Sequence, residues 1–222
     1  MGVTGFAGQA GGRRRPSGGA DGGDRAWYKG GVELGAWLVD DLAAVRARFL
    51  NAIAAPVPEG WWAERADGGG SSIAALLLHV TVHQDLALHT ALGGRAPRFA
   101  AAAAGLGLDA GASPLASLQE AEDPDLTRAL DVAALQGYAA AIHDDVVAAL
   151  AQITATELEA RPPASERLAA VGGVDHDQAP WLHAMWDGKP AAWFVRWELI
   201  GHAQGHVGEM VSVRDRLGFR PF

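Results

Sequence analysis

The sequence predicts an all-α fold, an antiparallel four-helix bundle with long connections between its helices. Four stretches of the chain place apolar residues at three- and four-residue spacing, which is the period of an amphipathic helix. Serine, proline and glycine stand at the ends of these stretches, where helices begin and end. The chain has 222 residues, which suits one domain with a substantial core. We therefore expect a single helical domain over residues 31–222.

A flexible tail is expected over residues 1–30, ahead of this domain. The segment is rich in glycine, with serine, aspartate and the basic triplet Arg13-Arg14-Arg15. Such a composition buries too little apolar surface to offset the entropy of ordering the chain. The triplet could instead form an interaction site, but composition alone favours a solvated tail.

The first two helices are expected over about residues 34–53 and from residue 71 or 72 to residue 92. Pro56 and Pro58 end the first, and Gly93-Gly94 ends the second, which begins with a serine cap after three glycines. The inward stripe of the first helix consists of Leu38, Leu42, Val45, Phe49 and Ile53. Both stretches therefore have an apolar face and clear ends.

Two long connections and two further helices complete the expected bundle. Residues 95–125 form a partly helical excursion or a mobile lid over a site, and residues 154–188 an irregular return. The third helix is expected over about residues 127–153, and the last from residue 189 or 190 to residue 217. The inward residues of the third are Leu135, Tyr138, Ile142, Val146 and Ala149.

The last helix carries two apolar stripes, so we expect it to be buried on two sides. One stripe consists of Leu199, Ala203, His206, Met210, Val213 and Leu217, and the other of Trp193, Trp197, Ile200, Val207 and Val211. The tryptophan stripe faces either a neighbouring helix or a second subunit, so a homodimer is possible.

Composition excludes several classes of partner. A net charge of -8, with no basic cluster beyond the tail triplet, argues against nucleic acid, whose phosphates need a basic face. No apolar run approaches the roughly 20 residues that span a bilayer, and no signal peptide is evident, so we expect no membrane partner and a cytoplasmic location. The sequence has no cysteine, so any thiol chemistry needs an external thiol.

Candidate metal ligands lie in the last helix and the second. His202 and His206 are four residues apart, which places both imidazoles on one helix face, about 5–6 Å apart at Cβ. His79 faces inward by its spacing, so the three rings could converge on one metal ion across the bundle. A histidine pair at this spacing in an arbitrary helix is more often solvated or packed than bound to metal. Packed, metal-free histidines are therefore the alternative.

The remaining histidines are weaker candidates. His83 lies one turn beyond His79 and could bind with it or instead of it, although His79 is preferred. His89 points to another face, whereas His143, His176 and His183 are expected to be ordinary surface residues. Two carboxylates, Glu198 and Glu209, lie within a turn of the paired histidines and could orient the imidazoles, or else face solvent.

Two known metal motifs do not fit. A zinc protease needs glutamate directly after the first histidine, where this chain has Ala203. Di-iron bundles need paired Glu-x-x-His segments, which the chain lacks.

The chain resembles the DinB superfamily over about residues 37–218. The likeness rests on Ser72 to Val80, Gln84-Asp85, and His202-Ala203-Gln204-Gly205-His206-Val207-Gly208-Glu209-Met210 with Arg214 and Leu217-Gly218. The resemblance implies a four-helix bundle that holds a divalent metal, zinc or nickel, through His79, His202 and His206.

The resemblance also implies a chemistry. Family members include low-molecular-weight thiol S-transferases and a mycothiol-dependent maleylpyruvate isomerase, so we expect a thiol cofactor whose sulfur binds the metal. The bound thiolate would attack a small electrophilic substrate. Arginine far outnumbers lysine, as in GC-rich coding, which favours mycothiol as the thiol. A non-catalytic metal-binding stress or regulatory protein, held as a dimer, is the alternative.

Overall fold

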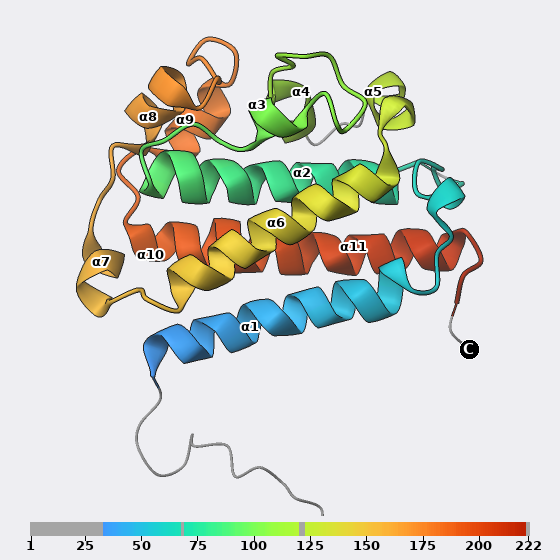
Figure 1. Ribbon diagram of the computed structural model, residues 1–222, viewed down its shortest axis with the longest axis horizontal. Helices are drawn as coiled ribbons and strands as arrows, with labels where there is room; N and C mark the ends of the chain where they lie inside the picture. The colour runs from blue at the N-terminus through green and yellow to red at the C-terminus, as the bar shows by residue number, and fades with distance from the viewer. Residues whose placement is uncertain (1–32, 68, 120–122, 221–222) are drawn as a thin grey trace, which may run out of the picture. The chain divides into compact units, whose positions relative to one another are not determined.

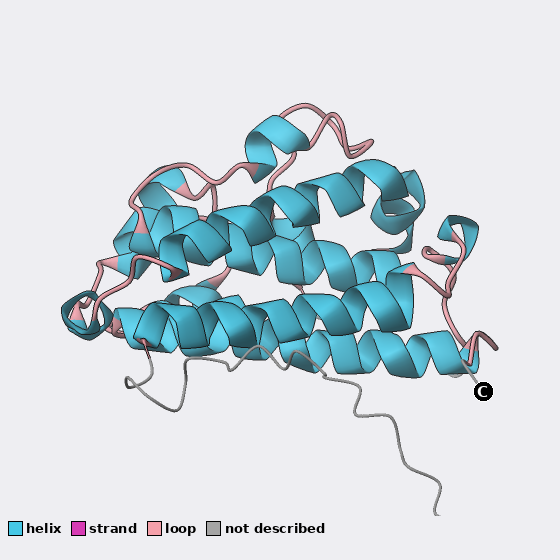
Figure 2. Ribbon diagram, turned by 60° about the horizontal axis from the view of Figure 1, so that its bottom comes forward, coloured by secondary structure: helices cyan, strands magenta, loops and turns pink. Residues whose placement is uncertain are grey.

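The computed structural model describes residues 33–67, 69–119 and 123–220. The predicted tail, residues 1–30, lies outside the described residues. All the regular secondary structure within them is helical: helices are joined by loops, and there is no strand among the described residues (Figure 2). None of the described helices is both long and apolar enough to cross a bilayer.

Four long helices form the bundle that the sequence predicts (Figure 1). They are α1 (Leu34–Phe49), α2 (Ile73–Asp85), α6 (Val132–Leu150) and α11 (His202–Arg216). α2 packs against both α6 and α11, and α1 packs against the same two helices. α1 and α6 run in opposite directions, as do α2 and α11, whereas α2 and α6 run the same way because residues 93–131 return the chain to the starting end of α2.

Three of the long helices are extended at one end by a π-helical segment. Such segments are rare and often lie at functional sites. The three segments are Leu50–Ala54 after α1, Leu86–Leu92 after α2, and Val195–Gly201 between α10 (Ala191–Phe194) and α11. The first, second and last predicted helices therefore have the expected ends within a few residues. Ser72 caps α2 as expected, its hydroxyl accepting from the Ala75 amide at 3.2 Å.

The connections are more helical than the sequence indicates. The expected irregular return, residues 154–188, contains α7 (Ala155–Glu159), α8 (Ala164–Val171) and α9 (Pro180–Trp186). The partly helical excursion over residues 95–125 contains α3 (Phe99–Ala102) and α4 (Leu115–Leu118), and α5 (Pro124–Ala129) begins at its end. The α1–α2 connection has a 3₁₀ turn, Glu59–Trp61. Local capping explains part of this, because Thr154 and Glu157 form a reciprocal capping box at α7.

The third predicted helix is broken near its start. Residues 127–153 were expected to form one helix, but Leu130 has an extended ψ of 130° between α5 and α6. Asp131 then caps α6, its carboxylate accepting from the Ala134 amide at 2.9 Å. A short acidic side chain favours this cap over continued helix, since it satisfies an amide that has no helical partner.

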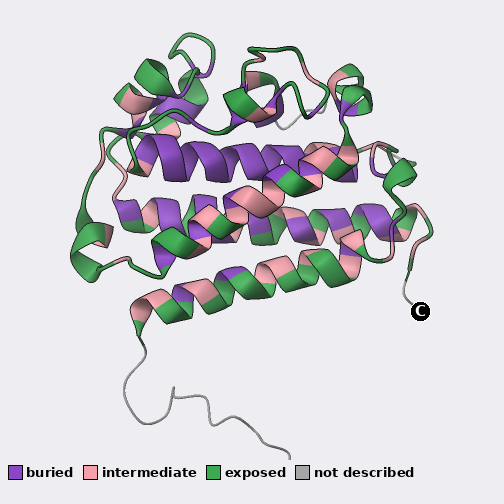
Figure 3. Ribbon diagram, in the orientation of Figure 1, coloured by how far each residue is buried: buried purple, intermediate pink, exposed green. Residues whose placement is uncertain are grey.

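The core surrounds α2, which is buried along almost its whole length (Figure 3). Bundle helices cover one part of α2, while α4 lies on another and α8 packs on its π-helical extension. Histidines on α2 are therefore removed from water. The last helix has two apolar stripes as predicted, but the second is only partly covered, since Trp197 is 47% exposed while Ile200 and Val207 are buried.

Replacing Gly107 with alanine is expected to destabilise the fold. Gly107 has φ +83°, and a Cβ there would collide with the Ala129 carbonyl oxygen. The left-handed conformation alone costs a side-chain-bearing residue about 1–3 kcal/mol. Urea unfolding of Gly107→Ala should show at least this loss. The matched variant Gly137→Ala, in α6 with open space around it, should gain about 0.5–1 kcal/mol, so equal effects would contradict the prediction.

Candidate metal centre

The structure brings His79, His202 and His206 together where α2 meets α11. His79 lies in the buried part of α2, and the other two occupy the first turns of α11. The His202 Nε2 atom lies 3.2 Å from His79 Nε2 and 2.9 Å from His206 Nε2. One donor atom from each residue lies within 4.8 Å of the other two, so the group could hold a metal ion.

Hydrogen bonds on the outer ring nitrogens orient two of these imidazoles. His79 Nδ1 lies 2.9 Å from the Ser117 carbonyl oxygen, and His206 Nδ1 lies 2.9 Å from Glu209 Oε2. A carbonyl or carboxylate only accepts, so each Nδ1 carries a proton, and a histidine with its one proton there has its lone pair on Nε2. These lone pairs face the centre of the group. Metal-binding histidines in proteins are held by the same kind of outer partner.

Burial keeps two of the rings neutral. Desolvation, followed by the nearby His83 ring, lowers the pKa of His79 to about 3. The same two causes, in the same order, lower the pKa of His202 to about 2. A metal ion binds the neutral imidazole, so protons do not compete for these two nitrogens near neutral pH.

The two glutamates play different parts. Glu209 is the outer partner of His206 and is partly exposed, which agrees with the orienting role. Glu198 is fully buried, so the alternative of a solvent-facing carboxylate is wrong for this residue. Its Oε2 atom lies 3.0 Å from His83 Nδ1 and 3.8 Å from His202 Nδ1. His83 therefore belongs with Glu198 and not to the group that contains His79.

A pocket opens beside His79 and His206. Its volume is about 340 Å³, within the size range of small-molecule sites. The lining of the pocket also includes Ala116, Ser117, Gln119 and Asp123, from the excursion that the sequence suggested as a lid. The same segment supplies the carbonyl that orients His79. Because His79 and His206 belong to this lining, a small molecule in the pocket would lie next to any ion that the three histidines held.

The other histidines differ in how far they are buried. His176 is exposed and His143 half-buried, close to expectation. The prediction of a surface role is wrong for His183, which is buried, with Nδ1 at 2.8 Å from Ser165 Oγ and Nε2 at 3.0 Å from the Val174 carbonyl oxygen. The segment around His183 is an ordered helix, α9, and both ring nitrogens have partners that compensate for burial.

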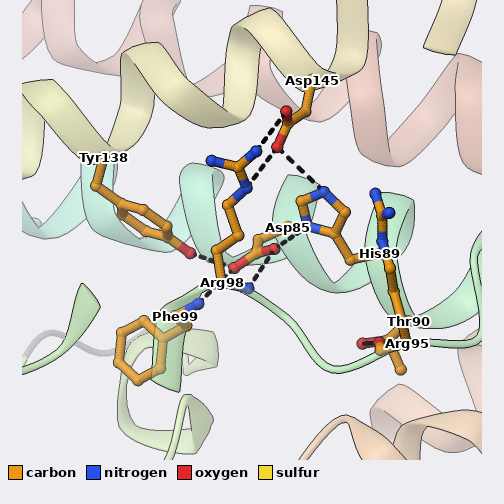
Figure 4. A network of polar contacts seen from close by, with 8 residues as sticks. All are labelled: Asp85, His89, Thr90, Arg95, Arg98, Phe99, Tyr138 and Asp145. Carbon is orange, nitrogen blue, oxygen red and sulfur yellow. Dashed lines mark hydrogen bonds and ion pairs between the residues drawn. The ribbon is translucent and has the colours of Figure 1, made fainter. Parts of the chain in front are cut away.

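Sequence reasoning missed a buried polar network around Asp85 (Figure 4). The Asp85 carboxylate accepts from the Tyr138 hydroxyl at 2.6 Å and from the backbone amides of Arg98 and Phe99 at 3.0 and 2.8 Å. It also pairs with His89 Nδ1, and burial together with Asp85 raises the pKa of Tyr138. The signal in the sequence for this network was Asp85 itself, a charged residue inside an apolar run.

This network anchors the excursion to α2. On its far side, His89 Nε2 and the Arg98 guanidinium lie 3.2 and 2.7 Å from Asp145 Oδ2 on α6. Arg98 and Phe99 begin the segment that later supplies Ser117 to the histidine group. Asp85 therefore anchors the start of the segment whose later residues line the pocket.

A comparison with known families identifies the group to which this bundle belongs. The sequence profile of the DinB superfamily matches residues 41–210. The chain belongs to the DinB superfamily. The match spans α2 and the first two turns of α11, so His79, His202 and His206 all lie within it. No curated protein and no solved structure matches the chain.

Proposed function

We propose that this DinB protein is a metal-dependent transferase or isomerase that uses a low-molecular-weight thiol, such as mycothiol, on a small electrophile. The observation that carries the proposal is the convergence of three Nε2 atoms beside a pocket of about 340 Å³. His79, His202 and His206 would hold a divalent ion, zinc or nickel. Such an ion supplies positive charge that lowers the pKa of a bound thiol, so that the thiolate forms near neutral pH.

The chain's own residues hold and orient the reactants in this proposal. Ser117 and Glu209 keep the outer nitrogens of His79 and His206 protonated, which directs the lone pairs inward. Polar side chains of Gln119, Asp123 and Thr127 line the pocket and would bind a polar small molecule. The thiol loses its proton to solvent, and an electron pair of the thiolate sulfur forms a bond to an electrophilic carbon. In a transferase the leaving group then departs with the electron pair of its broken bond and takes up a proton. In an isomerase the adduct rotates about the adjacent carbon–carbon bond, and cleavage of the new sulfur–carbon bond then returns the thiolate.

Thiol binding and turnover test this function. The full chain, stripped with a chelator and reloaded with Co²⁺, should develop a thiolate-to-metal absorption band on addition of mycothiol or another small thiol. The zinc- or nickel-loaded protein should convert an electrophile in the presence of the thiol faster than the uncatalysed reaction in solution, with the thiol consumed by a transferase and regenerated by an isomerase. His79→Ala should lose both signals, and the exposed control His176→Ala should keep them. Metal-loaded protein that binds no thiol would contradict the enzymatic proposal.

A non-catalytic metal-binding dimer is the second candidate. Trp37 and Trp197 are 48% and 47% exposed, so each leaves a large apolar surface in contact with solvent. A dimer would cover them. A monomer in solution, measured by light scattering at micromolar concentration, would remove this alternative, whereas a metal-loaded dimer without thiol turnover would favour it.

A further inference from the structure

A second group of potential ligands lies on the other side of His202. It consists of His83, Glu198 and His202, and one donor atom of each lies within 4.8 Å of the other two. Glu198 Oε2 lies 3.0 Å from His83 Nδ1 and 3.8 Å from His202 Nδ1. Donors that share a zinc-sized ion, each about 2.0–2.1 Å from it, are separated by roughly 3.0–3.5 Å. The observed spacing is close to this range.

Protein contacts leave this second group incompletely satisfied. Among the described residues, His202 Nδ1, which lies on the Glu198 side of its ring, is a buried nitrogen without a hydrogen-bond partner. An unpartnered buried polar atom is costly and calls for an explanation, an unseen ion included. His202 is the residue shared by the two groups, since its Nε2 atom faces His79 and His206.

The surroundings of Glu198 prepare one oxygen for a ligand. Trp186 Nε1 donates to Glu198 Oε1 at 2.7 Å, which fixes the carboxylate and leaves Oε2 facing the two histidines. Two further indoles flank these rings: Trp197 stacks on His202 at 6.1 Å and 18°, and Trp181 lies 6.5 Å from His83. An apolar wall of this kind limits access of water to a metal site.

We propose that His83, Glu198 and His202 form a second divalent-cation site, and that the His202 ring bridges it to the first. His202 would contribute Nε2 to the ion held with His79 and His206, and Nδ1 to the second ion. The ion at His79, His202 and His206 is the one on which the proposed function depends. The second ion, at His83 and Glu198, does not depend on that function.

The bridge requires one proton to leave His202. A neutral imidazole has one lone pair, so binding two ions releases the remaining ring proton to solvent and leaves an imidazolate with a lone pair on each nitrogen. The cations stabilise the deprotonated ring, as they do other bound acids. The negative charges of the imidazolate and of Glu198 partly balance the two cations. The unpartnered His202 Nδ1 atom gains a ligand in this state.

Metal stoichiometry tests the second site directly. The full chain is stripped with a chelator, dialysed against Zn²⁺ alone, and assayed by elemental analysis. The unmodified protein should bind two ions. His83→Gln should lose only the second ion and His206→Gln only the first, so each should bind one, and His202→Gln should bind none. Circular dichroism of each variant checks that the helices remain.

A magnetic measurement separates a bridged pair from two independent ions. With Cu²⁺ in both sites, an imidazolate bridge couples the two spins, so the electron paramagnetic resonance signal should be weaker than two isolated ions give. His83→Gln should restore the full signal of its single Cu²⁺.

Two results overturn the second site. One ion in the unmodified protein, kept in His83→Gln but lost in His206→Gln, would exclude it while leaving the first site and the proposed function intact. Two uncoupled Cu²⁺ ions would exclude the bridge. Protein that takes up no ion would remove both the second site and the proposed function.

Discussion

Replacing His202 with alanine is expected to abolish binding of divalent metal to the folded protein. His202 lies between the other two histidines, with its Nε2 atom 3.2 and 2.9 Å from theirs, and no other described residue could take that place. Losing only an outer partner of a ligand weakens metal affinity by about 10–100-fold, so losing the central ligand should cost more. Elemental analysis and calorimetric titration with Zn²⁺ measure the effect.

Metal should also cease to stabilise this variant. An ion present at 100 times its dissociation constant stabilises the unmodified fold by about 2.7 kcal/mol, and this gain should disappear in His202→Ala. The control is His176→Ala, because His176 is exposed and belongs to neither group of ligands. Equal metal content and equal stabilisation in the two variants would show that the cluster is a packed, metal-free arrangement.

Replacing Asp85 with alanine is expected to produce a large loss of stability. The carboxylate is fully buried and accepts from the Tyr138 hydroxyl and two backbone amides, besides pairing with His89. Removing it leaves these buried donors without an acceptor. Breaking a buried charged network in this way costs about 3–5 kcal/mol. The free energy of unfolding in urea, measured without metal, gives the value.

The matched control is Asp125→Ala, because the Asp125 side chain is 90% exposed and pairs only with a surface arginine. This change should alter stability by no more than about 0.5 kcal/mol. Tyr138→Phe removes one of the four donors and should give an intermediate loss of about 1–3 kcal/mol. An Asp85→Ala protein as stable as the control would show that the network does not anchor the excursion.

The bundle and the three candidate ligands could be predicted because they depend on spacing along single helices. Helix periodicity located three of the four long helices within a few residues, and the four-residue interval between His202 and His206 placed both rings on one face. His79 was also identified from its position on the apolar stripe. The break at Leu130 was not predicted, because periodicity is continuous there and a single cap residue, Asp131, decides it.

Tertiary structure decided the surroundings of these ligands. Whether Glu198 faces solvent or the core cannot be read from helix spacing, since it depends on α9, whose Trp186 donates to it across the fold. Similarly, Ser117 reaches His79 because α4 packs on α2, a contact between segments far apart in the chain. His183 was misassigned for the same reason, as its partners come from separate turns of the return segment.

The sequence by itself determined that this protein is a helical bundle with paired histidines on its last helix. Those features arise from residues a few positions apart, and helix geometry relates such residues directly. Only the tertiary structure decided which ring nitrogens face one another, which carboxylate is buried beside them, and that a pocket opens at their edge. These properties depend on contacts between segments far apart in the chain, whose positions are set by the packing of the whole core.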